Sequence, residues 1–361
     1  MKFSIDRSAL LRALGHVQSV VERRNTIPIL SNVLLKAEDG QLSMATTDMD
    51  LEINESVAAD VESGGSITAP ANTLHDIVRK LPEGEPVEIN VGENENNMEV
   101  RAGRSKFRLS CLPVADFPTI GVGELPVEFS ISAPDLRAII DRTKFAMSTE
   151  ETRYYLNGIY LHASEKDGVE VLRAVATDGH RLAMFDMPLP ENASGMPAII
   201  IPRKTVGEIR KLVEDAADTV QISLSESKVR FSFDHIVVTS KLIDGTFPDY
   251  KRVIPEGNNK VVEVNPNIFS SAIDRVSTIS DGKSRAVKIT LNGKSMTLSA
   301  NSQESGSATE DIEVVSEAPE IEIGFNARYL LDITSLINGE GCQMIMADSN
   351  KAAIIQDTSD Q

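Results

Sequence analysis

His180 is the residue whose surroundings come closest to catalytic chemistry, because it follows Gly179 and lies two residues after Asp178. A carboxylate near an imidazole is an arrangement that serves general base catalysis. However, no serine or cysteine lies in a nucleophile context, and no His, Cys and Asp cluster has the spacing of metal ligands. Five histidines in the whole chain also argue against a histidine-rich metal site. The sequence therefore predicts a protein that is not an enzyme and that carries no metal and no cofactor.

Contact with phosphate is the other chemistry that the residue types permit, and it depends on where the basic residues lie. The net charge of −18 by itself argues against nucleic acid, because such binding normally comes from a basic surface. Yet the six expected helices hold 15 Lys and Arg against 7 Asp and Glu, whereas the rest of the chain holds 21 against 47. This partition favours basic helices that face a polyanion and acidic sheets that face away. The alternative is that arginine simply suits exposed helix faces.

Helical periodicity predicts the elements that carry these basic residues. Leu10, Leu14, Val17 and Val21 are spaced by four and three residues, so they share one face of a helix. Alternating apolar residues, as in 229–233, predict strands. The expected helices span residues 7–24, 71–80, 134–146, 203–213, 266–276 and 326–337. The fold class is therefore α+β, with antiparallel sheets that carry two helices in each unit.

The chain is built from repeated units. Segments 110–118 and 240–248 share Ser, Leu, Phe and Pro at a constant offset of 130 residues, and Thr47-Asp48 recurs as Thr177-Asp178 at the same offset. A third and more diverged copy begins near residue 262. Such self-similarity is the signature of a repeat architecture. It predicts three domains of ordinary size, at residues 1–122, 123–256 and 257–361.

Repeats that bury a face against their neighbours can form an arc or a closed ring. Three units in each chain, doubled by a two-fold axis, would give six units and twelve helices. At about 10 Å for each helix, twelve helices side by side enclose a hole of about 28 Å. Such a hole admits a DNA duplex with a layer of water. The contacts inside would be Lys and Arg to phosphate, without reading of the base sequence.

Composition bounds the remaining possibilities. No run of 18 apolar residues occurs, so no membrane-spanning helix is expected, and residues 1–6 lack the apolar stretch of a signal peptide. Cys111 and Cys342 lie in different units without CxxC spacing, which favours buried thiols in a reducing, cytoplasmic setting. Tryptophan is absent and aromatic residues are few, which weakens any case for extensive stacking of single-stranded bases.

Three segments then carry a resemblance to a known family. They are Arg-Tyr-Tyr-Leu-Asn-Gly at 153–158, Thr-Asp-Gly-His-Arg-Leu-Ala at 177–183 and Phe-Pro-Asp-Tyr at 247–250. The chain resembles, over essentially its whole length, the β sliding clamp family of bacterial DNA polymerase III. The resemblance implies three DNA-clamp domains in a head-to-tail homodimeric ring whose helices line a central hole. Such a ring encircles duplex DNA and tethers the replicative polymerase. Polymerase subunits, the clamp loader and repair proteins would bind it through short linear motifs.

The resemblance also implies a pocket for partner peptides between the second and third units. Apolar side chains would form its socket, and arginine and histidine would offer polar contacts at the rim. The implied pocket residues are Arg153, Leu156, Thr177, Gly179, His180, Arg181, Leu182, Pro248, Val253, Asn350 and Ala352. Asn350 and Ala352 differ in side chain from the family pattern. Alternatively, Leu156 and Leu182 are core residues and Arg181 is a solvated charge. The family also carries a last apolar strand beyond the equivalent of Gln361, which this sequence does not include.

For DNA, the resemblance implies contacts from one arginine and two adjacent tyrosines, with two basic residues at the start of a helix as further candidates. These residues are Arg24, Tyr154, Tyr155, Arg203 and Lys204. Glu150 replaces a glutamine-like contact of the family. The alternative for the two tyrosines is packing between units.

For the ring interface, Phe107 and Leu109 match positions that meet Thr278 and Ile279 of a second copy, although alternating residues of this kind are also ordinary strand core. Two functions of different classes remain open. The first is a processivity clamp. The second is a monomeric three-repeat scaffold that binds proteins through the 153–182 region and never encircles DNA.

Overall fold

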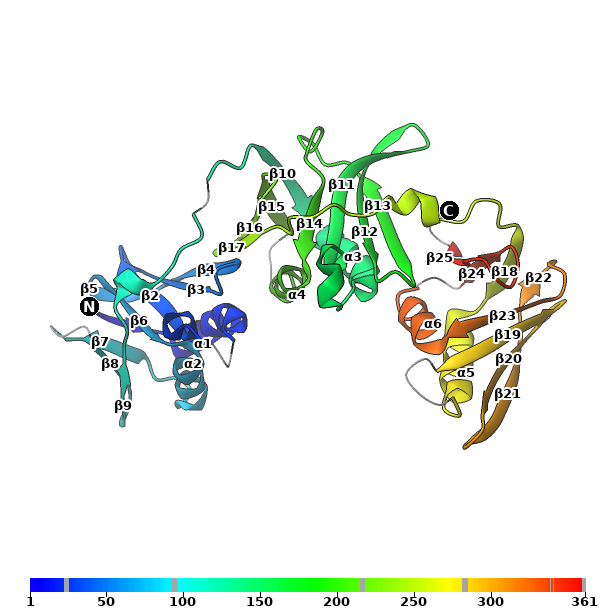
Figure 1. The fold of residues 1–361 in the computed structure, drawn as a ribbon. Coiled ribbons are helices and arrows are strands. Elements are labelled where there is room, and N and C mark those ends of the chain that lie inside the picture. The colour runs from blue at the N-terminus through cyan, green and yellow to red at the C-terminus, as the bar shows by residue number, and fades with distance from the viewer. Residues whose placement is uncertain are drawn as a thin grey trace. The chain divides into compact units, whose positions relative to one another are not determined.

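The structure is a computed structural model that describes residues 1–22, 26–92, 96–121, 123–214, 218–280, 285–337, 339 and 341–358 (Figure 1). Its contacts group the chain into two compact units, Met1–Thr246 and Phe247–Gln361. Each unit combines antiparallel sheets with helices, which confirms the α+β class. No helix in the described ranges has both the length and the apolar character needed to cross a membrane.

The first repeat consists of nine strands and two α-helices within its described residues. The strands are β1 (Lys2–Ile5), β2 (Asn32–Glu38), β3 (Gln41–Thr47), β4 (Leu51–Ala58), β5 (Asp60–Ser63), β6 (Gly65–Pro70), β7 (Val87–Val91), β8 (Asn97–Ala102) and β9 (Ser105–Ser110). The helices are α1 (Arg7–Val17) and α2 (Ala71–Lys80), with 3-10 helices at Gln18–Val20, Pro28–Ser31 and Val114–Asp116. One sheet has the order β5-β1-β7-β8-β9, and β4-β3-β2-β6 is half of a second sheet.

The second repeat completes that second sheet. Its strands are β10 (Val127–Ser132), β11 (Gly158–Lys166), β12 (Val169–Thr177), β13 (Leu182–Pro188), β14 (Ile199–Pro202), β15 (Thr219–Leu224), β16 (Lys228–Phe233) and β17 (Ile236–Lys241). Its helices are α3 (Ala133–Thr143) and α4 (Arg203–Leu212), with 3-10 helices at Lys144–Ala146 and Glu151–Leu156. Strands β10-β15-β16-β17 join β4-β3-β2-β6 through pairing of β17 with β4, and β13-β12-β11-β14 forms a separate sheet. The shared sheet makes the first two repeats one compact unit.

The third repeat forms the other compact unit. Its strands are β18 (Lys260–Val264), β19 (Ala286–Asn292), β20 (Ser295–Ser302), β21 (Gly306–Glu313), β22 (Val315–Ser316), β23 (Ile321–Asn326), β24 (Cys342–Met346) and β25 (Ile354–Asp357). Its helices are α5 (Pro266–Ser277) and α6 (Ala327–Thr334), with a 3-10 helix at Tyr250–Val253. The order β21-β20-β19-β23 repeats β4-β3-β2-β6 and β13-β12-β11-β14 of the other copies, and β22-β18-β24-β25 corresponds to β5-β1-β7-β8 of the first copy. The predicted triple repeat is therefore confirmed.

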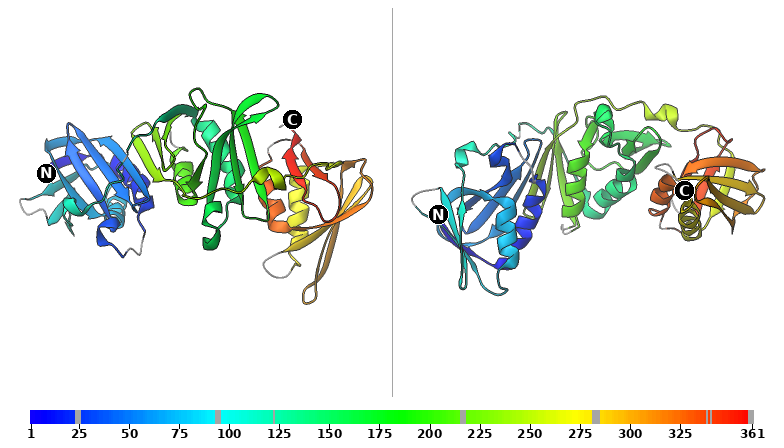
Figure 2. Two further views of the ribbon diagram at one scale, coloured as in Figure 1. Left: turned by 45° about the horizontal axis from the view of Figure 1, so that its top comes forward. Right: turned by 60° about the horizontal axis from the view of Figure 1, so that its bottom comes forward.

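The helices pack in pairs, α1 on α2, α3 on α4 and α5 on α6 (Figure 2). In α1 the predicted apolar face is buried, because Leu10, Leu14 and Val17 have no exposed surface. The side chain of Asp6 caps this helix by accepting hydrogen bonds from the N–H groups of its first turn. The apolar periodicity of the sequence thus translates directly into the core.

The helix expected over 7–24 is wrong at its end. Helix α1 stops at Val17 and a 3-10 helix follows to Val20. The hydroxyl of Ser19 donates to the carbonyl of His16 at 2.7 Å, and the hydroxyl of Thr46 on β3 donates to the carbonyl of Val17. These side chains take carbonyls that another helical turn would use, so the α-helix does not continue. Similarly, the helix expected over 326–337 is shorter and spans Ala327–Thr334.

Candidate functional site

The turn between β12 and β13 contains most of the predicted pocket residues. The hydroxyl of Thr177 accepts a hydrogen bond from the N–H of Gly179 at 3.1 Å and donates to the carbonyl of Arg181 at 2.7 Å. One oxygen of Asp178 accepts from the N–H groups of His180 and Arg181 at 2.9 and 3.0 Å. Side-chain acceptors of this kind stabilise a turn locally. Asp178 therefore serves the backbone of the turn, and His180 is left exposed.

Two observations favour glycine at position 179. Its φ of +87° lies in the left-handed region, which favours glycine. A Cβ at this position would also lie 2.7 Å from Nη1 of Arg153. Arg153 belongs to the 3-10 helix before β11, and its Nε lies 3.4 Å from a carboxylate oxygen of Glu150. The structure thus brings Arg153 and the turn together, as the resemblance implied.

Arg181 is fixed in place rather than solvated. Its Nε donates to Asp178 at 3.2 Å, its Nη2 donates to the carbonyl of Phe145 at 2.6 Å, and its guanidinium carbon lies 5.1 Å from the centroid of the Phe145 ring. The two leucines differ. Leu156 is only 4% exposed, as a core residue would be, whereas Leu182 at the start of β13 is half-buried.

The remaining predicted pocket residues belong to the compact unit Phe247–Gln361. Pro248 is exposed, and the side chain of Val253 is 64% exposed in the 3-10 helix Tyr250–Val253. The N–H of Asn350 donates to Asp348 at 2.9 Å. The carbonyl of Ala352 accepts from the side-chain amide of Asn258 at 3.0 Å. Val253 therefore offers an exposed apolar side chain five residues after Pro248. The backbone at Ala352 is held by its hydrogen bond with Asn258.

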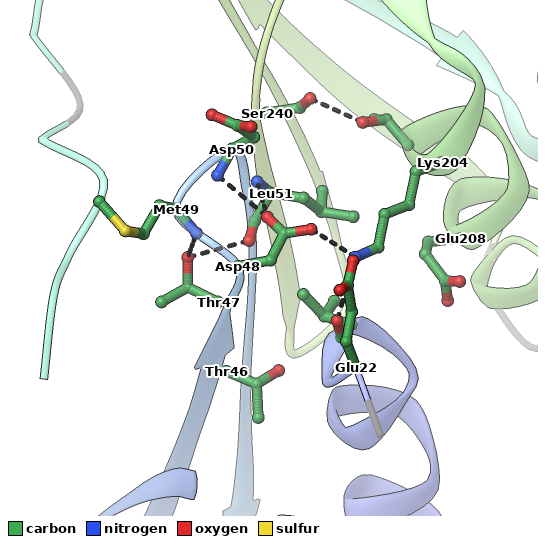
Figure 3. A network of polar contacts seen from close by, with 12 residues as sticks. Glu22, Thr46, Thr47, Asp48, Met49, Asp50, Leu51, Lys204, Glu208 and Ser240 are labelled. Carbon is green, nitrogen blue, oxygen red and sulfur yellow. Dashed lines mark hydrogen bonds and ion pairs between the residues drawn. The ribbon is translucent and has the colours of Figure 1, made fainter. Parts of the chain in front are cut away.

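The turn of the first repeat has the same hydrogen bonds as the turn 177–181 (Figure 3). The hydroxyl of Thr47 accepts from the N–H of Met49 at 2.9 Å and donates to the carbonyl of Leu51 at 3.0 Å. One oxygen of Asp48 accepts from the N–H groups of Asp50 and Leu51 at 2.9 and 2.7 Å. The shared Thr-Asp pairs in the sequence therefore mark one structural motif.

The third repeat contains a related but shorter turn, which the sequence did not reveal. The hydroxyl of Ser302 accepts from the N–H groups of Glu304 and Ser305 at 3.2 and 3.0 Å. Ser302 ends β20, as Thr47 ends β3, and its acceptor serves the residues two and three positions later. Ser302 therefore holds the place of Thr47, and three residues instead of four separate it from its paired residue Gly306, so the identity of residues could not signal this turn.

Lys204 is the predicted DNA contact with the most partners in the structure. It lies in the first turn of α4 and donates to the carbonyl of Val20 at 3.2 Å and to Glu22 at 3.4 Å, and it is hydrogen-bonded to Asp48 (Figure 3). Burial alone would lower the pKa of Lys204, but the hydrogen bond and charge of Asp48, with Glu22, outweigh it and raise that pKa above 10.5. Lys204 thus ties the second repeat to the first.

The other predicted DNA contacts are more open. Arg203 is exposed, and its N–H donates to the carbonyl of Asn157 at 2.9 Å. Tyr154 is 53% exposed, and its ring meets that of Tyr155 edge-to-face with centroids 5.7 Å apart. Arg24 lies outside the residues that the structure describes.

Many helical cations are neutralised by acidic neighbours. Arg210 and Lys144 both bond to Asp141, at 2.8 and 2.6 Å. Burial alone would raise the pKa of Asp141, but these two cations outweigh it and hold that pKa below 3.8. The helical cations that make no ion pair with another described residue are Arg12, Lys80, Arg137, Arg203 and Arg328. The positive charge available to phosphate is therefore smaller than the sequence count suggests.

The predicted interface residues lie at the edges of their elements. Phe107 is 36% exposed and Leu109 is 9% exposed, on β9, which ends its sheet in the strand order. Thr278 is the exposed residue directly after α5, and Ile279 is half-buried. Within the described residues no three His, Cys, Asp or Glu side chains are placed to hold a metal ion.

Comparisons with known proteins agree along the whole chain. Residues 1–121, 130–249 and 251–361 match the N-terminal, central and C-terminal domains of the DNA polymerase III beta subunit. The chain is 49% identical to the beta sliding clamp of Caulobacter vibrioides over 360 residues, which is 100% of this chain and 97% of the relative. It is 37% identical to the beta sliding clamp of Escherichia coli K12 over 362 residues, again 100% of this chain and 97% of the relative.

Solved structures give the same result. The sliding clamp of Bartonella birtlesii, crystallised with griselimycin, superposes with a TM-score of 0.96 at 49% identity, with 99% of this chain and 96% of that chain covered. The beta sliding clamp of Caulobacter crescentus superposes with a TM-score of 0.97 at 49% identity and the same coverage.

Proposed function

The chain belongs to the family of DNA polymerase III beta subunits, the beta sliding clamps, and we propose that two copies close into a ring around duplex DNA and tether the replicative polymerase to it. Clamps of this family are non-catalytic processivity factors that form dimers and bind polymerase and other partners through peptide motifs. The observation that carries the proposal of a ring is the sheet joint between the first two repeats.

The pairing of β17 with β4 is a model for how one repeat can join the next. Strand β17 pairs with β4 from Ile236 opposite Glu55 to Ser240 opposite Leu51. In the order of the sheets, β9 holds the place of β17, and β21 holds the place of β4. Both β9 and β21 are edge strands in the described residues, and exposed edges tend to pair. We infer that β9 of one copy pairs with β21 of the other, which is a head-to-tail association that closes with two copies.

The register of the joint carries over to this proposed interface. Ser110 is equivalent to Ser240 through the offset of 130. Ser305 is equivalent to Leu51, because each directly precedes the residue that pairs with the end of the previous strand. This register sets Phe107 opposite Ala308, so a large ring meets a small side chain. Leu109, Thr278 and Ile279 complete the proposed interface.

For DNA, we propose phosphate contacts without base reading inside the ring. The helical cations on α1, α2, α3, α4 and α6 that make no ion pair with another described residue support this, because their charge can attract an anion. The proposed contacts are Arg24, Tyr154, Tyr155, Arg203 and Lys204. Since the net charge is −18, encirclement rather than tight face-on attraction would retain the protein on DNA.

For partners, we propose that a short peptide binds on the turn 177–181. The rigid hydrogen bonding of the turn, the exposed His180 and the half-buried Leu182 support this site. The full proposed set is Arg153, Leu156, Thr177, Gly179, His180, Arg181, Leu182, Pro248, Val253, Asn350 and Ala352. Because the turn is already held by its hydrogen bonds, it loses little conformational entropy when a peptide binds to it.

We also propose domain bounds at 1–122, 123–256 and 257–361, and a cytoplasmic location. The family matches begin and end close to these bounds. Burial raises the pKa of the Cys111 thiol to about 11 and that of Cys342 to about 12, so both thiols stay protonated. Unreactive free thiols fit a reducing compartment.

Retention on circular DNA tests the ring. The protein is loaded onto nicked circles by a clamp loader, and the circles are then cut. We expect the protein to stay on circles and to leave linear DNA through the open ends. A complex that survives cutting with unblocked ends would contradict encirclement. The mass in solution tests the alternative of a monomeric scaffold, because a ring requires about twice 39.2 kDa.

A further inference from the structure

One sheet of the compact unit Phe247–Gln361 carries a row of apolar side chains on its outer face. Val261 on β18 pairs with Ile345 on β24, and Ile345 pairs with Ile354 on β25 (Figure 1). The adjacent residues Val262 and Met344 have no exposed surface and belong to the core, so the row lies on the opposite face of the sheet. Val261 is 40% exposed, and both isoleucines are half-buried. We call Val261, Ile345 and Ile354 the apolar row.

The other two repeats have polar residues at the same positions. In each repeat, the row begins four residues before the side chain that caps the first helix, which is Asp6, Ser132 or Asn265. Strand pairing then identifies the other members of each row. The equivalent rows are Lys2, Asn90 and Glu99 in the first repeat and Glu128, Ser223 and Arg230 in the second. The fold therefore does not require apolar residues here, and adjoining exposed apolar groups of this kind indicate a contact surface.

The apolar row adjoins the part of the proposed peptide site that this unit contributes. Ala352 is exposed and stands two residues before Ile354, and Ala353 between them packs against the core, so Ala352 and Ile354 face the same side. The side-chain amide of Asn258 donates to the carbonyls of Ile345 and Ala352, at 2.9 and 3.0 Å. One side chain thus fixes the apolar row next to the proposed site.

The size of the apolar row favours a short segment of a partner over a second copy of this chain. A stable contact between two proteins buries about 800 Å² on each of them. Three side chains, two of them already half-buried, provide far less. The next row on the same face is polar, since Gln343 donates to Glu263 at 3.3 Å and accepts from Gln356 at 2.8 Å. A segment that is already tethered nearby needs little surface, because tethering raises its effective concentration.

We propose that the apolar row binds an apolar side chain of a partner protein, in the segment that directly adjoins the partner's short motif. The proposal rests on the proposed function, because the motif must first occupy the proposed peptide site. Ile345 and Val261 lie one and two strand spacings from Ile354, so the row is about 10 Å long. About four extended residues beyond the motif reach from Ala352 to the far end of the row.

The test uses the full chain and three labelled peptides that share one motif with a glutamine and a Leu/Phe pair. The first peptide is the motif alone, the second adds four serines at each end, and the third adds alternating valine and serine over the same lengths. Fluorescence anisotropy measures binding. We expect the valine flanks to bind about 10-fold more tightly than the serine flanks, because one apolar side chain leaves water. Equal affinities for the two flanked peptides would overturn the proposal.

The motif alone separates this proposal from the proposed function. If the motif alone did not bind, the proposed peptide site and the apolar row would be rejected together. If the motif bound and the valine flanks added nothing, only the apolar row would be rejected.

Variants of the row test whether the preference for valine arises there. A triple variant with Val261→Lys, Ile345→Asn and Ile354→Glu carries the residues of the first repeat, and it should lose the preference. Val261→Lys alone should also reduce the preference, and it changes a side chain that is already 40% exposed, so it remains informative if the triple variant does not fold. A preference that persisted in Val261→Lys and in a folded triple variant would contradict the proposal.

Val315→Ser is the matched control. Val315 is 71% exposed on β22 and pairs with Glu263, so it lies on the same face but outside the apolar row. The preference for valine flanks should persist in this variant, and its loss would indicate unspecific apolar attraction instead. If the triple variant kept the preference and lowered the mass in sedimentation, the row would be a contact between copies of the chain, against the proposal.

Discussion

The turns 47–51 and 177–181 have the same backbone hydrogen bonds and different surroundings. In the first, the free oxygen of Asp48 is taken by Lys204 from the following repeat. In the second, the corresponding oxygen of Asp178 is taken by Arg181 of the turn itself, and His180 stays exposed. One local motif thus serves as a joint between repeats in one place and as a candidate binding surface in the other. What covers the turn, rather than its own geometry, separates the two roles.

The residue that pairs with the threonine at the end of the strand follows the same division. Residue 52 in the covered copy is Glu52, which is 8% exposed and accepts hydrogen bonds from the N–H of Ile120 and the amide of Asn54, both at 2.8 Å. At the offset of 130 the open copy has Leu182, which is half-buried. Glu52, whose carboxylate accepts two hydrogen bonds, suits a turn that is covered by the next repeat. Leu182 is apolar and half-buried, and it suits a turn that binds a partner through an apolar side chain.

The largest expected effect is on the open turn. Leu182→Asp should weaken binding of a peptide with a glutamine and a Leu/Phe pair by at least about 100-fold, because the new charge would be buried without a partner. The measurement is a titration of labelled peptide. Val169→Asp is the matched control, since Val169 lies on β12 of the same sheet and is already 60% exposed. Unchanged binding in Leu182→Asp would place the pocket elsewhere.

Removal of the shared aspartate should harm the joint more than the open turn. Asp48→Ala takes away the acceptor of two backbone N–H groups and the partner of Lys204, and it should lower the free energy of unfolding by about 2–3 kcal/mol. Asp178→Ala should cost about 1–2 kcal/mol, because Arg181 keeps its bond to the carbonyl of Phe145. Urea unfolding followed by circular dichroism measures both. A larger loss of unfolding free energy for Asp178→Ala than for Asp48→Ala would contradict this difference between the two turns.

The third residue of each turn should respond with opposite signs. Met49 has a φ of +79° and is 45% exposed, so Met49→Gly relieves a conformation that is unfavourable for methionine. It should raise the free energy of unfolding by up to about 1 kcal/mol. Gly179→Ala should lower it by about 1 kcal/mol, because alanine is strained at a φ of +87°. If both substitutions shifted the melting temperature in the same direction, the φ values would not explain the strain in the two turns.

The smallest expected effect is alkaline sensitivity of the joint. The pKa of Lys204 is raised above 10.5 in the folded protein, so its contribution is complete below pH 10.5 and is lost as the pH rises through the folded value. A partly exposed ion pair contributes less than about 1 kcal/mol. The stability difference between the unmodified protein and Lys204→Met should therefore shrink at high pH. The difference for Arg181→Met should persist, since guanidinium remains charged. If the stability difference depended on pH in the same way for both variants, the ion pairs of Lys204 would not account for the alkaline sensitivity.

The candidate site was predictable in part. The motif at residues 177–183 carried the resemblance that implied a pocket, and the offset of 130 residues related Thr177-Asp178 to Thr47-Asp48. The sequence missed the related turn of the third repeat, because that turn is one residue shorter and Ser302 stands where the other copies have threonine. It also predicted Lys204 as a contact for DNA without its bonds to Asp48 and Val20, residues more than 150 positions away. Local patterns can be recognised in a sequence, whereas contacts such as that of Lys204 with Asp48 depend on the tertiary fold.

By itself, the sequence determined the triple repeat, the antiparallel α+β class and the buried faces of the helices, because these depend on spacing along the chain. Only the tertiary structure decided where α1 ends, since the hydroxyl that takes the Val17 carbonyl comes from β3. The tertiary structure alone decided which helical cations form ion pairs, because acidic partners such as Asp48 and Asp141 come from other elements. It also decided that Val261, Ile345 and Ile354 form one apolar row, because strand pairing sets them side by side. Hydrogen bonding and burial depend on distances in space, and residues far apart in sequence set those distances.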